Sequence, residues 1–529
     1  MMRLLRICGI CCLALCQSVA FQSSLQAQFT DDANFLSVNK IFTDYMVLQR
    51  DQPIHIWGKG MPGANVRVTL SRPSTAIDSG LAQRTNITRA QRDNSAVARV
   101  NRDSTWSVYL HAESASSQPR DLKIISGKKN ILISNMLLGD IWICIGQSNM
   151  EWPMQREMHY VESKAVANQP LLRFYNPTYA GKNIFNQYFS DSVLQMVHPS
   201  TFFTPTNWQV SDSNSFRTMS AVAYYYGKSI VENTKVPIGL INLSIAGAPL
   251  ETFIGINALK SDAQFAAKAS EPWLTNPAIP IWVKERGQQN LRGGTSHPFK
   301  PGHAYEAGIQ PLFPFAIKGI INYQGESNAQ ELERVWEYVQ LSKLLISDYR
   351  KQWHSPAMPF YFVQLSSIDT LKYKGHFWPQ FRNEQRIMLA NIPHSGMAVC
   401  SDIGLKDNVH PTNKKLVGER LARWALNKNY GVKILPSGPL PIEAKYQNGK
   451  VIISFQYAGK GLQTADDGIL KGFSFNGTQS ESATINHNRI HIPSKIKPDF
   501  VYYGWKSYSD GNLVNSDLLP ASTFKIPVQ

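Results

Sequence analysis

The sequence predicts an α/β protein whose central parallel sheet is sandwiched by helices and flanked by β-rich regions at both ends of the chain. Between about residues 136 and 430, short apolar runs alternate with longer segments of helical periodicity, as in buried parallel strands and their crossover helices. On either side of this region, apolar and polar residues alternate over short runs punctuated by glycine and proline, as in half-buried strands. With 529 residues, 43% of them hydrophobic, the chain is long enough for about two to four domains with sizeable cores.

The first 27 residues have the layout of a secretory signal peptide. Two arginines precede an apolar stretch that ends near Cys16, and small residues follow at cleavage-like positions. We therefore expect the mature chain to be exported to the periplasm or out of the cell. Only Cys144 and Cys400 would remain in it, so the chain is not a disulfide scaffold, which favours a bacterial periplasmic or extracellular protein over a eukaryotic secreted one. Both lie in apolar runs, so we expect buried thiols, with a disulfide as the alternative.

The two flanking regions share a strand-and-turn pattern. Residues 28–135 are expected to form an N-terminal β-sandwich-like domain. Its expected strands cover residues 54–57, 66–70, 106–110 and 122–125. Residues 431–529 form a C-terminal β-rich region with expected strands at 451–455 and 500–505. Because chain termini often lie close together, this region either stands alone or packs with the N-terminal domain.

The central region, residues 136–430, is expected to be one catalytic-type domain. Its expected strands cover residues 141–146, 236–243, 316–322, 360–365 and 397–401. Its expected helices cover residues 221–231, 332–353, 378–389 and 414–429. The stretch from about 255 to 303 is rich in Pro, Gly, Gln and Asn, which predicts a long loop excursion over the catalytic face.

The charge balance is strongly basic. Lys and Arg number 54 against 38 Asp and Glu, for a formal net charge of +16, and the basic residues are spread along the chain. Such a surface either simply keeps the protein soluble or attracts an anionic substrate or polymer. Because no recognisable nucleic-acid-binding motif accompanies the charge, we expect no nucleic-acid partner.

In an open parallel sheet, ligands bind at the carboxyl ends of the strands, so the residues that follow each strand are the functional candidates. Ser148 follows the first central strand at a turn into a helix, where hydrolases place a nucleophile; capping the helix is its alternative role. Gly247 lies among small residues after the next strand, where a backbone N–H can approach a substrate oxyanion, although a plain turn would look the same.

Polar residues also follow two later strands. Asn328 and its neighbours come after the strand that ends near Tyr323, and a side-chain amide there would reach the same oxygen. Glu326 would suggest acid–base chemistry instead, but it has no evident partner carboxylate. Asp407 and His410 are three residues apart in the last loop, so the carboxylate can hold the imidazole in the tautomer of a general base.

Metal ligation is the competing role for His410. No second His or Cys stands at ligand spacing from it, so we expect neither a metal nor a cofactor.

Three motifs taken together resemble those of a known family. Residues 146–150 (GQSNM), 323–328 (YQGESN) and 407–411 (DNVHP) are similar to motifs of the sialate O-acetylesterases, a branch of the SGNH hydrolases. Further similarity covers most of the mature chain, at residues 46–50, 56–58, 314–319, 350–353, 360–365, 512–513 and 519–521. The resemblance implies a three-layer α/β/α, flavodoxin-like catalytic domain. It also implies an exported serine esterase that hydrolyses O-acetyl esters of sialic acid through an acyl-enzyme intermediate.

The resemblance also implies roles for single residues. Ser148 would attack the acetyl carbonyl, His410 would take its proton and later activate water, and Asp407 would orient His410. The backbone N–H groups of Ser148 and Gly247 and the amide of Asn328 would form the oxyanion hole.

Four further residues are expected to bind the substrate. Gln147, Gln324 and Glu326 lie within the motifs, and Arg382 is the candidate to clamp the sialic acid carboxylate, because arginine binds carboxylates bidentately.

The chain departs from the family pattern around the expected pocket. At residues 245–248 it has Ile-Ala-Gly-Ala, whereas the family usually has Trp-Gly-Gly-Thr. Asn322 stands where the family usually has a Trp before its Tyr-Gln-Gly-Glu motif, and Phe253 replaces another usual Trp. Two alternatives therefore stay open: an acetyl esterase for neutral sugars such as acetylated xylan, and a non-catalytic carbohydrate-binding protein. The complete set of serine, aspartate and histidine argues against the second.

Overall fold

The computed structural model describes residues 35–71, 94–292, 296–371 and 373–529. The chain forms two compact units, one drawn from residues up to 134 and the other from 43–52, 112–119 and 135–529. The expected signal peptide, residues 1–27, lies outside the described residues. In the described part, no helix combines the length and the apolar composition needed to cross a bilayer.

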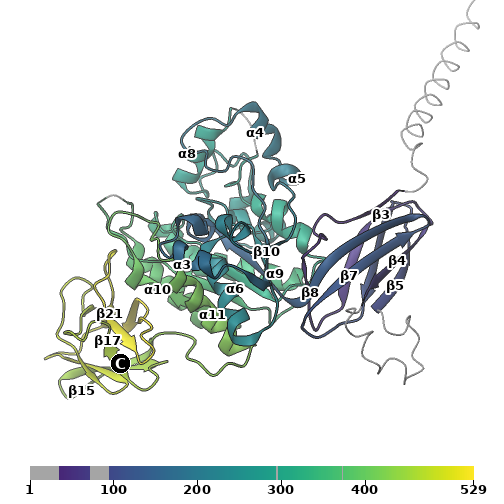
Figure 1. The fold of residues 1–529 in the computed structure, drawn as a ribbon. Coiled ribbons are helices and arrows are strands. Elements are labelled where there is room, and N and C mark those ends of the chain that lie inside the picture. The colour runs from purple at the N-terminus through teal and green to yellow at the C-terminus, as the bar shows by residue number, and fades with distance from the viewer. Residues whose placement is uncertain (1–34, 72–93, 293–295, 372) are drawn as a thin grey trace, which may run out of the picture. The chain divides into compact units, whose positions relative to one another are not determined.

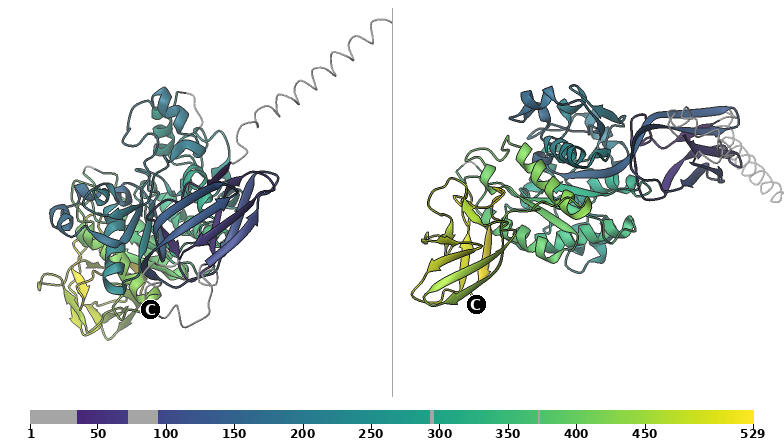
Figure 2. Two further views of the ribbon diagram at one scale, coloured as in Figure 1. Left: turned by 45° about the vertical axis from the view of Figure 1, so that its right-hand side comes forward. Right: turned by 60° about the horizontal axis from the view of Figure 1, so that its bottom comes forward.

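The first unit is built from antiparallel strands, drawn as purple to blue arrows in Figure 2. Its strands are β1 (Leu36–Val38), β3 (Ile54–Gly60), β4 (Asn65–Leu70), β5 (Asn94–Arg99), β6 (Thr105–Leu110) and β7 (Ser116–Ser126). β3 pairs with β1 and β6, and β4 pairs with β5 and β7. Alternate residues of β4 and β6 are buried, which is the period-two pattern of a strand with one face in a core. All four strands expected in this region are present.

The second unit contains a mixed sheet of seven strands in the order β10-β9-β11-β8-β12-β13-β14. The strands are β8 (Lys129–Gly146), β9 (Gln169–Tyr175), β10 (Gln209–Ser211), β11 (Ile238–Asn242), β12 (Gly319–Tyr323), β13 (Phe360–Gln364) and β14 (Ser395–Val399). Neighbours from β9 to β14 are parallel, and β10 runs antiparallel to β9 at one edge. Every residue of β11, β12 and β13 is buried, which explains their unbroken apolar sequences. The predicted α/β class is confirmed, whereas β9 and β10 were not expected.

Four long helices flank this sheet at the positions expected from the sequence. They are α6 (Ala221–Thr234), α9 (Leu332–Gln352), α10 (Trp378–Asn391) and α11 (Lys415–Asn429). α6 packs against α11, and α9 packs against α10. The contact between α6 and α11 depends on Gly418, because a Cβ there would collide with the backbone carbonyl of Val222.

The prediction that residues 255–303 form a long loop is wrong. The segment contains α7 (Ile256–Ser261), η6 (Ala266–Ala269) and α8 (Ile281–Asn290). The polar composition of α8 and its Gly287 suggest a loop, but Gly287 packs against the Trp273 ring, where a larger residue would not fit. Figure 1 shows α8 beside α4 (Asp191–Met196) and α5 (Pro199–Phe202), and hydrogen bonds tie Asn290 to the segment just before α4.

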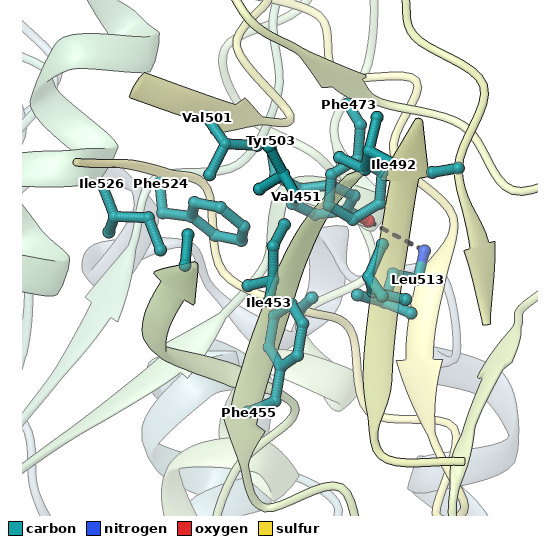
Figure 3. Close-up of a cluster of buried hydrophobic side chains, with 14 of the residues drawn as sticks. Val451, Ile453, Phe455, Phe473, Ile492, Val501, Tyr503, Leu513, Phe524 and Ile526 are labelled. Carbon is teal, nitrogen blue, oxygen red and sulfur yellow. Dashed lines mark hydrogen bonds between the residues drawn. The ribbon is translucent and has the colours of Figure 1, made fainter. Parts of the chain in front are cut away.

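The C-terminal region folds as three small antiparallel sheets around one apolar core. Their strand orders are β15-β16-β20-β19, β17-β22 and β18-β21-β23. The strands are β15 (Leu440–Gln447), β16 (Lys450–Gln456), β17 (Leu462–Thr464), β18 (Phe473–Ser474), β19 (Thr484–Asn486), β20 (Arg489–Pro493), β21 (Phe500–Tyr503), β22 (Leu513–Asn515) and β23 (Phe524–Pro527). Figure 3 shows aromatic and branched side chains such as Val451, Phe473 and Phe524 meeting in this core, with the Tyr503 hydroxyl accepting the Leu513 N–H at 2.8 Å.

The C-terminal region belongs to the same compact unit as the central sheet. Residues 46–50, expected in the N-terminal β-domain, also belong to the second unit. There β2 (Val47–Gln49) pairs in parallel with β8, and Gln49 and Arg50 both donate to the Asp140 carboxylate. A buried acceptor on β8 therefore holds this segment to the central sheet.

Candidate active site

Ser148 lies where β8 turns into α2 (Ser148–Glu151). Gly146, the last residue of β8, has a φ of +133°, and a Cβ there would collide with the carbonyl of Tyr323 at the end of β12. A glycine is therefore required for the two strand ends to approach at this turn. The turn presents the Ser148 hydroxyl at the carboxyl edge of the sheet, as expected from the sequence.

The loop after β14 brings His410 to the same edge. Nε2 of His410 lies 2.8 Å from Oγ of Ser148, although 262 positions separate the two residues. The imidazole stacks on the Trp152 ring at 5.4 Å between centroids, and its backbone N–H donates to Asn408 Oδ1 at 2.9 Å. The ring is thus held with one nitrogen on the serine hydroxyl.

The surroundings of His410 favour its neutral form. Burial lowers the pKa of His410 to about 4, and the positive charges of Lys414 and Arg156 act in the same direction. A neutral imidazole can accept the serine proton. Asp407 is exposed in the same loop, three residues before His410, and the expected hydrogen bond between its carboxylate and Nδ1 of His410 stays a prediction.

Two backbone N–H groups in the loops after β8 and β11 are open. Among the described residues, neither the Ser148 N–H nor the Gly247 N–H donates to a protein acceptor. Gly247 has a φ of +75°, and a Cβ there would lie 2.8 Å from the Phe299 ring. Its carbonyl accepts the Ser327 hydroxyl at 3.0 Å, which fixes the peptide. Such fixed donors suit a developing negative charge.

The Asn328 side chain makes three hydrogen bonds within the protein. Its Nδ2 donates to Glu251 Oε2 at 3.0 Å, and its Oδ1 accepts from the Leu250 N–H at 3.1 Å and from Gln324 Nε2 at 2.7 Å. The residue is fully buried. The amide therefore joins two loops, and because its Nδ2 carries a second N–H, the expected role of Asn328 as an oxyanion donor stays a prediction.

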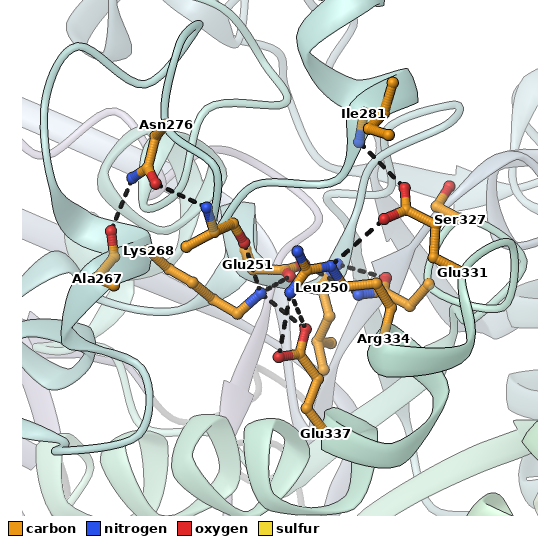
Figure 4. A network of polar contacts seen from close by, with 12 residues as sticks. Leu250, Glu251, Ala267, Lys268, Asn276, Ile281, Ser327, Glu331, Arg334 and Glu337 are labelled. Carbon is orange, nitrogen blue, oxygen red and sulfur yellow. Dashed lines mark hydrogen bonds and ion pairs between the residues drawn. The ribbon is translucent and has the colours of Figure 1, made fainter.

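The acceptor for Asn328 belongs to a buried ionic network (Figure 4). Lys268 lies 3.0 Å from Glu251 Oε1 and 2.7 Å from Glu337 Oε1. Burial alone would raise the pKa of Glu251, but Lys268 and the Asn328 amide outweigh it and lower that pKa. Glu251 therefore stays ionised and holds the Asn328 amide by a charge-assisted hydrogen bond.

The three motif residues expected to bind substrate also point inward. Gln147, Gln324 and Glu326 are 3%, 1% and 2% exposed. Gln147 Oε1 accepts the Ser327 N–H at 3.2 Å, and Gln324 Oε1 accepts the Tyr338 hydroxyl at 2.8 Å. These side chains hold the strand-end loops together, so their expected contacts with substrate are not supported.

Arg382 is likewise corrected. Its side chain is fully buried in α10, and its guanidinium donates to the carbonyls of Gly504 at 3.1 Å and Ser507 at 3.2 Å, and also to that of Lys506. The residue therefore ties α10 to the C-terminal sheets, and its one unpartnered donor, Nε, is buried.

Two residues that sequence reasoning missed lie directly beneath the site. Asn149 Nδ2 donates to Glu326 Oε1 at 2.6 Å and to the Val409 carbonyl at 2.9 Å, and Lys414 Nζ donates to Asn149 Oδ1. Burial raises the pKa of Glu326 to about 7 and lowers that of Lys414 to about 7. Their only sequence signal is position, since Asn149 follows Ser148 and Lys414 comes four residues after His410.

Neither thiol takes part in the site. Cys144 and Cys400 are both free and buried, so the expected disulfide alternative is not formed. Burial raises the pKa of Cys400 to about 12. In the described parts of the chain, no three His, Cys, Asp or Glu side chains are gathered as they would be around a metal ion.

Comparison with known proteins identifies the class. Residues 292–427 match the family model described as carbohydrate esterase, sialic acid-specific acetylesterase. Sialate O-acetylesterase of Mus musculus is 27% identical over 456 residues, covering 78% of this chain and 77% of the mouse protein. That of Homo sapiens is 27% identical over 436 residues, covering 78% and 75%. A crystal structure of a novel carbohydrate acetylesterase from Xanthomonas citri superposes with a TM-score of 0.73 at 28% identity, over 93% of this chain and 99% of that one.

The protein is therefore a carboxylic ester hydrolase. More narrowly, its relatives by sequence are sialate O-acetylesterases, and residues 292–427 match the sialic acid-specific acetylesterase model.

Proposed function

We propose that this protein is an exported serine esterase that removes O-acetyl groups from sialic acid through an acetyl-enzyme intermediate. The observation that carries the proposal is the 2.8 Å separation between Ser148 Oγ and Nε2 of a neutral His410, next to two open backbone N–H groups. The proposal includes the three-layer α/β/α arrangement of the SGNH hydrolases for the central domain, and a bacterial source. Export rests on the first 27 residues.

The proposed first half-reaction forms the acetyl-enzyme. Ser148 Oγ attacks the acetyl carbonyl carbon while its proton passes to Nε2 of His410. The carbonyl oxygen becomes an oxyanion, which the N–H groups of Ser148 and Gly247 stabilise. The C–O bond to the sugar then breaks, and the sugar oxygen takes the proton from His410.

The proposed second half-reaction releases acetate. A water molecule gives a proton to His410 and attacks the acetyl group on Ser148. The serine oxygen leaves, recovers the proton from His410, and acetate departs. Asp407 is proposed to hold His410 in the tautomer that carries its proton on Nδ1, so that Nε2 is the acceptor.

The substrate class follows from two lines of support. The relatives named above are sialate O-acetylesterases, and sialic acid carries a carboxylate that suits a chain of net charge +16. The alternative, an activity on neutral acetylated sugars, is supported by the similar fold of the carbohydrate acetylesterase and by residues 245–248, which differ from the family pattern.

The test compares acetate release by the purified protein from O-acetylated sialic acid and from acetylated xylan. We expect kcat/KM to be at least about tenfold higher on sialic acid. A preference for xylan would assign the neutral-sugar activity instead. A folded protein that released acetate from neither would support the carbohydrate-binding alternative.

The pH dependence is a second prediction. Because only the neutral ring of His410 can take the serine proton, kcat/KM is expected to be low below pH 4 and to rise with pH through about pH 4, well under the ordinary histidine value. Arg156→Gln removes a positive charge that opposes protonation, so the pKa of His410 rises and the acid limb moves upward by about half a pH unit or less. The measurement is a pH profile of kcat/KM.

The matched control is Arg217→Gln, another exposed arginine, which is expected to leave the limb in place. If the acid limb of the wild-type kcat/KM profile had an apparent pKa at or above the ordinary histidine value, the electrostatic account of His410 would be contradicted.

A further inference from the structure

A narrow pocket adjoins the loop that carries Gly247. Its walls come from the segment after β9, from Ile245 and Ala246, from α8, and from residues 297–299. Its cavity volume is about 20 Å³. That is room for about one or two water molecules, so a whole sugar ring does not fit inside it.

Two walls of the pocket are shared with the active site. The Tyr179 hydroxyl donates to Glu151 Oε2 at 2.8 Å, on the helix that begins at Ser148, and accepts the Ala246 N–H at 3.1 Å. Phe299 places its ring against Gly247. The pocket is therefore connected by direct contacts to the helix that begins at Ser148 and to the loop of Gly247.

Arg286 of α8 is the open cation of the pocket. Its Nη1 is buried, and among the described residues no acceptor reaches that atom and no carboxylate pairs with the side chain. The guanidinium lies 5.7 Å from the centre of the Phe185 ring. Burial lowers the pKa of Arg286, with no nearby anion to offset it. Burying an unpaired charge is unfavourable, and an anionic ligand would remove that penalty.

The other polar groups of the pocket are already engaged. His297 lies 3.1 Å from Asn290 Oδ1 through Nε2, and its Nδ1 accepts the Phe299 N–H at 3.0 Å. Burial lowers the pKa of His297 to about 3, so it is neutral. Lys182, on the segment after β9, is paired with Glu151 at 3.0 Å. Among the described residues that line the pocket, Arg286 is the one with a buried polar atom that has no partner.

We propose that Arg286 binds the carboxylate of an acidic sugar and so selects sialic acid over neutral acetylated sugars. This inference rests on the proposed esterase function and replaces Arg382 in the carboxylate-binding role. A guanidinium is suited to it because its planar fork matches two carboxylate oxygens, and the phenyl ring of Phe185 offers an apolar face beside it.

The test measures acetate release from O-acetylated sialic acid and from its carboxyl methyl ester, which removes the negative charge and keeps the acetyl group. The wild type is expected to favour the free acid by about 10- to 100-fold in kcat/KM. In Arg286→Met this preference is expected to fall to within about threefold of unity, and Arg286→Lys should keep an intermediate preference. The matched control is Arg292→Met, because Arg292 is exposed, lies just beyond α8 and stacks on Tyr188; it should keep the wild-type preference.

Thermal unfolding supplies a second readout. Because Arg286 has no protein anion to lose, Arg286→Met is expected to unfold at the wild-type temperature or higher. An equal loss of kcat/KM on both substrates, with the preference retained, would show a structural role and overturn the inference. A wild type that releases acetate from both forms equally well overturns the inference but leaves the proposed function standing. A wild type inert on both forms overturns the proposed function, and the role of Arg286 falls with it.

Discussion

Ser148→Ala is expected to lower kcat for acetate release by about 10⁴-fold or more. The substitution removes the only oxygen placed to attack, 2.8 Å from His410 Nε2, and leaves the backbone N–H groups of residues 148 and 247 in place. Those groups can still bind the ester, so KM should change far less than kcat. The measurement is steady-state kinetics on O-acetylated sialic acid, together with mass spectrometry of acid-quenched enzyme to detect one acetyl group on the wild type alone.

Ser213→Ala is the matched control, because Ser213 is an exposed turn residue in the same unit. It should keep the wild-type kcat. If Ser148→Ala retained a tenth or more of the wild-type rate, or if the acetyl group were found on another residue, the serine mechanism would be wrong.

Asn149→Ala is expected to have the largest effect on stability, about 3–5 kcal/mol lower free energy of unfolding. Asn149 is fully buried and is the bridge between the carboxyl of Glu326 and the ammonium of Lys414. Alanine would leave both groups without this partner in a water-free setting. The same side chain donates to the Val409 carbonyl, next to the general base, so kcat should also fall by about 10²-fold as His410 loses its alignment.

Urea unfolding gives the stability change, and kinetics at low temperature, where the variant remains folded, give the rate. Asn233→Ala is the matched control: this exposed asparagine donates only to the Ser229 carbonyl one helical turn earlier, and its loss should change stability by about 0.5 kcal/mol or less. Wild-type stability and kcat in Asn149→Ala would show that the polar bridge supports neither the fold nor the site.

The arrangement beneath the site explains why its motifs hold so many polar residues. The strand-end loops are joined by hydrogen bonds of the side-chain amides of Gln147, Gln324 and Asn328. Asn149 lies between Glu326 and Lys414 and is hydrogen-bonded to both. Apart from the bond between Gln324 and Asn328, each bond joins segments far apart in the chain. We infer that this buried layer fixes the spacing between the nucleophile and the base, which a surface loop alone would not hold.

The strands and helices of the central region could be predicted because each has a local cause. β11, β12 and β13 are buried at every residue and therefore read as unbroken apolar runs, and α9 shows one apolar stripe over 21 residues. The helices between 255 and 303 could not be predicted in this way. α8 contains glycine and few apolar residues, and its packing partner, Trp273, lies outside the helix.

By itself the sequence determined the α/β class and the positions of Ser148, Gly247 and His410, because strand periodicity is local and residues after parallel strands must share one edge of the sheet. Only the tertiary structure decided which motif side chains face the substrate. Asn328 and Arg382 turned inward and Arg286 was left with open donors, since the direction of a polar side chain depends on which distant carbonyls and carboxylates lie within hydrogen-bond reach. That reach is set by how the loops pack, which no local pattern encodes.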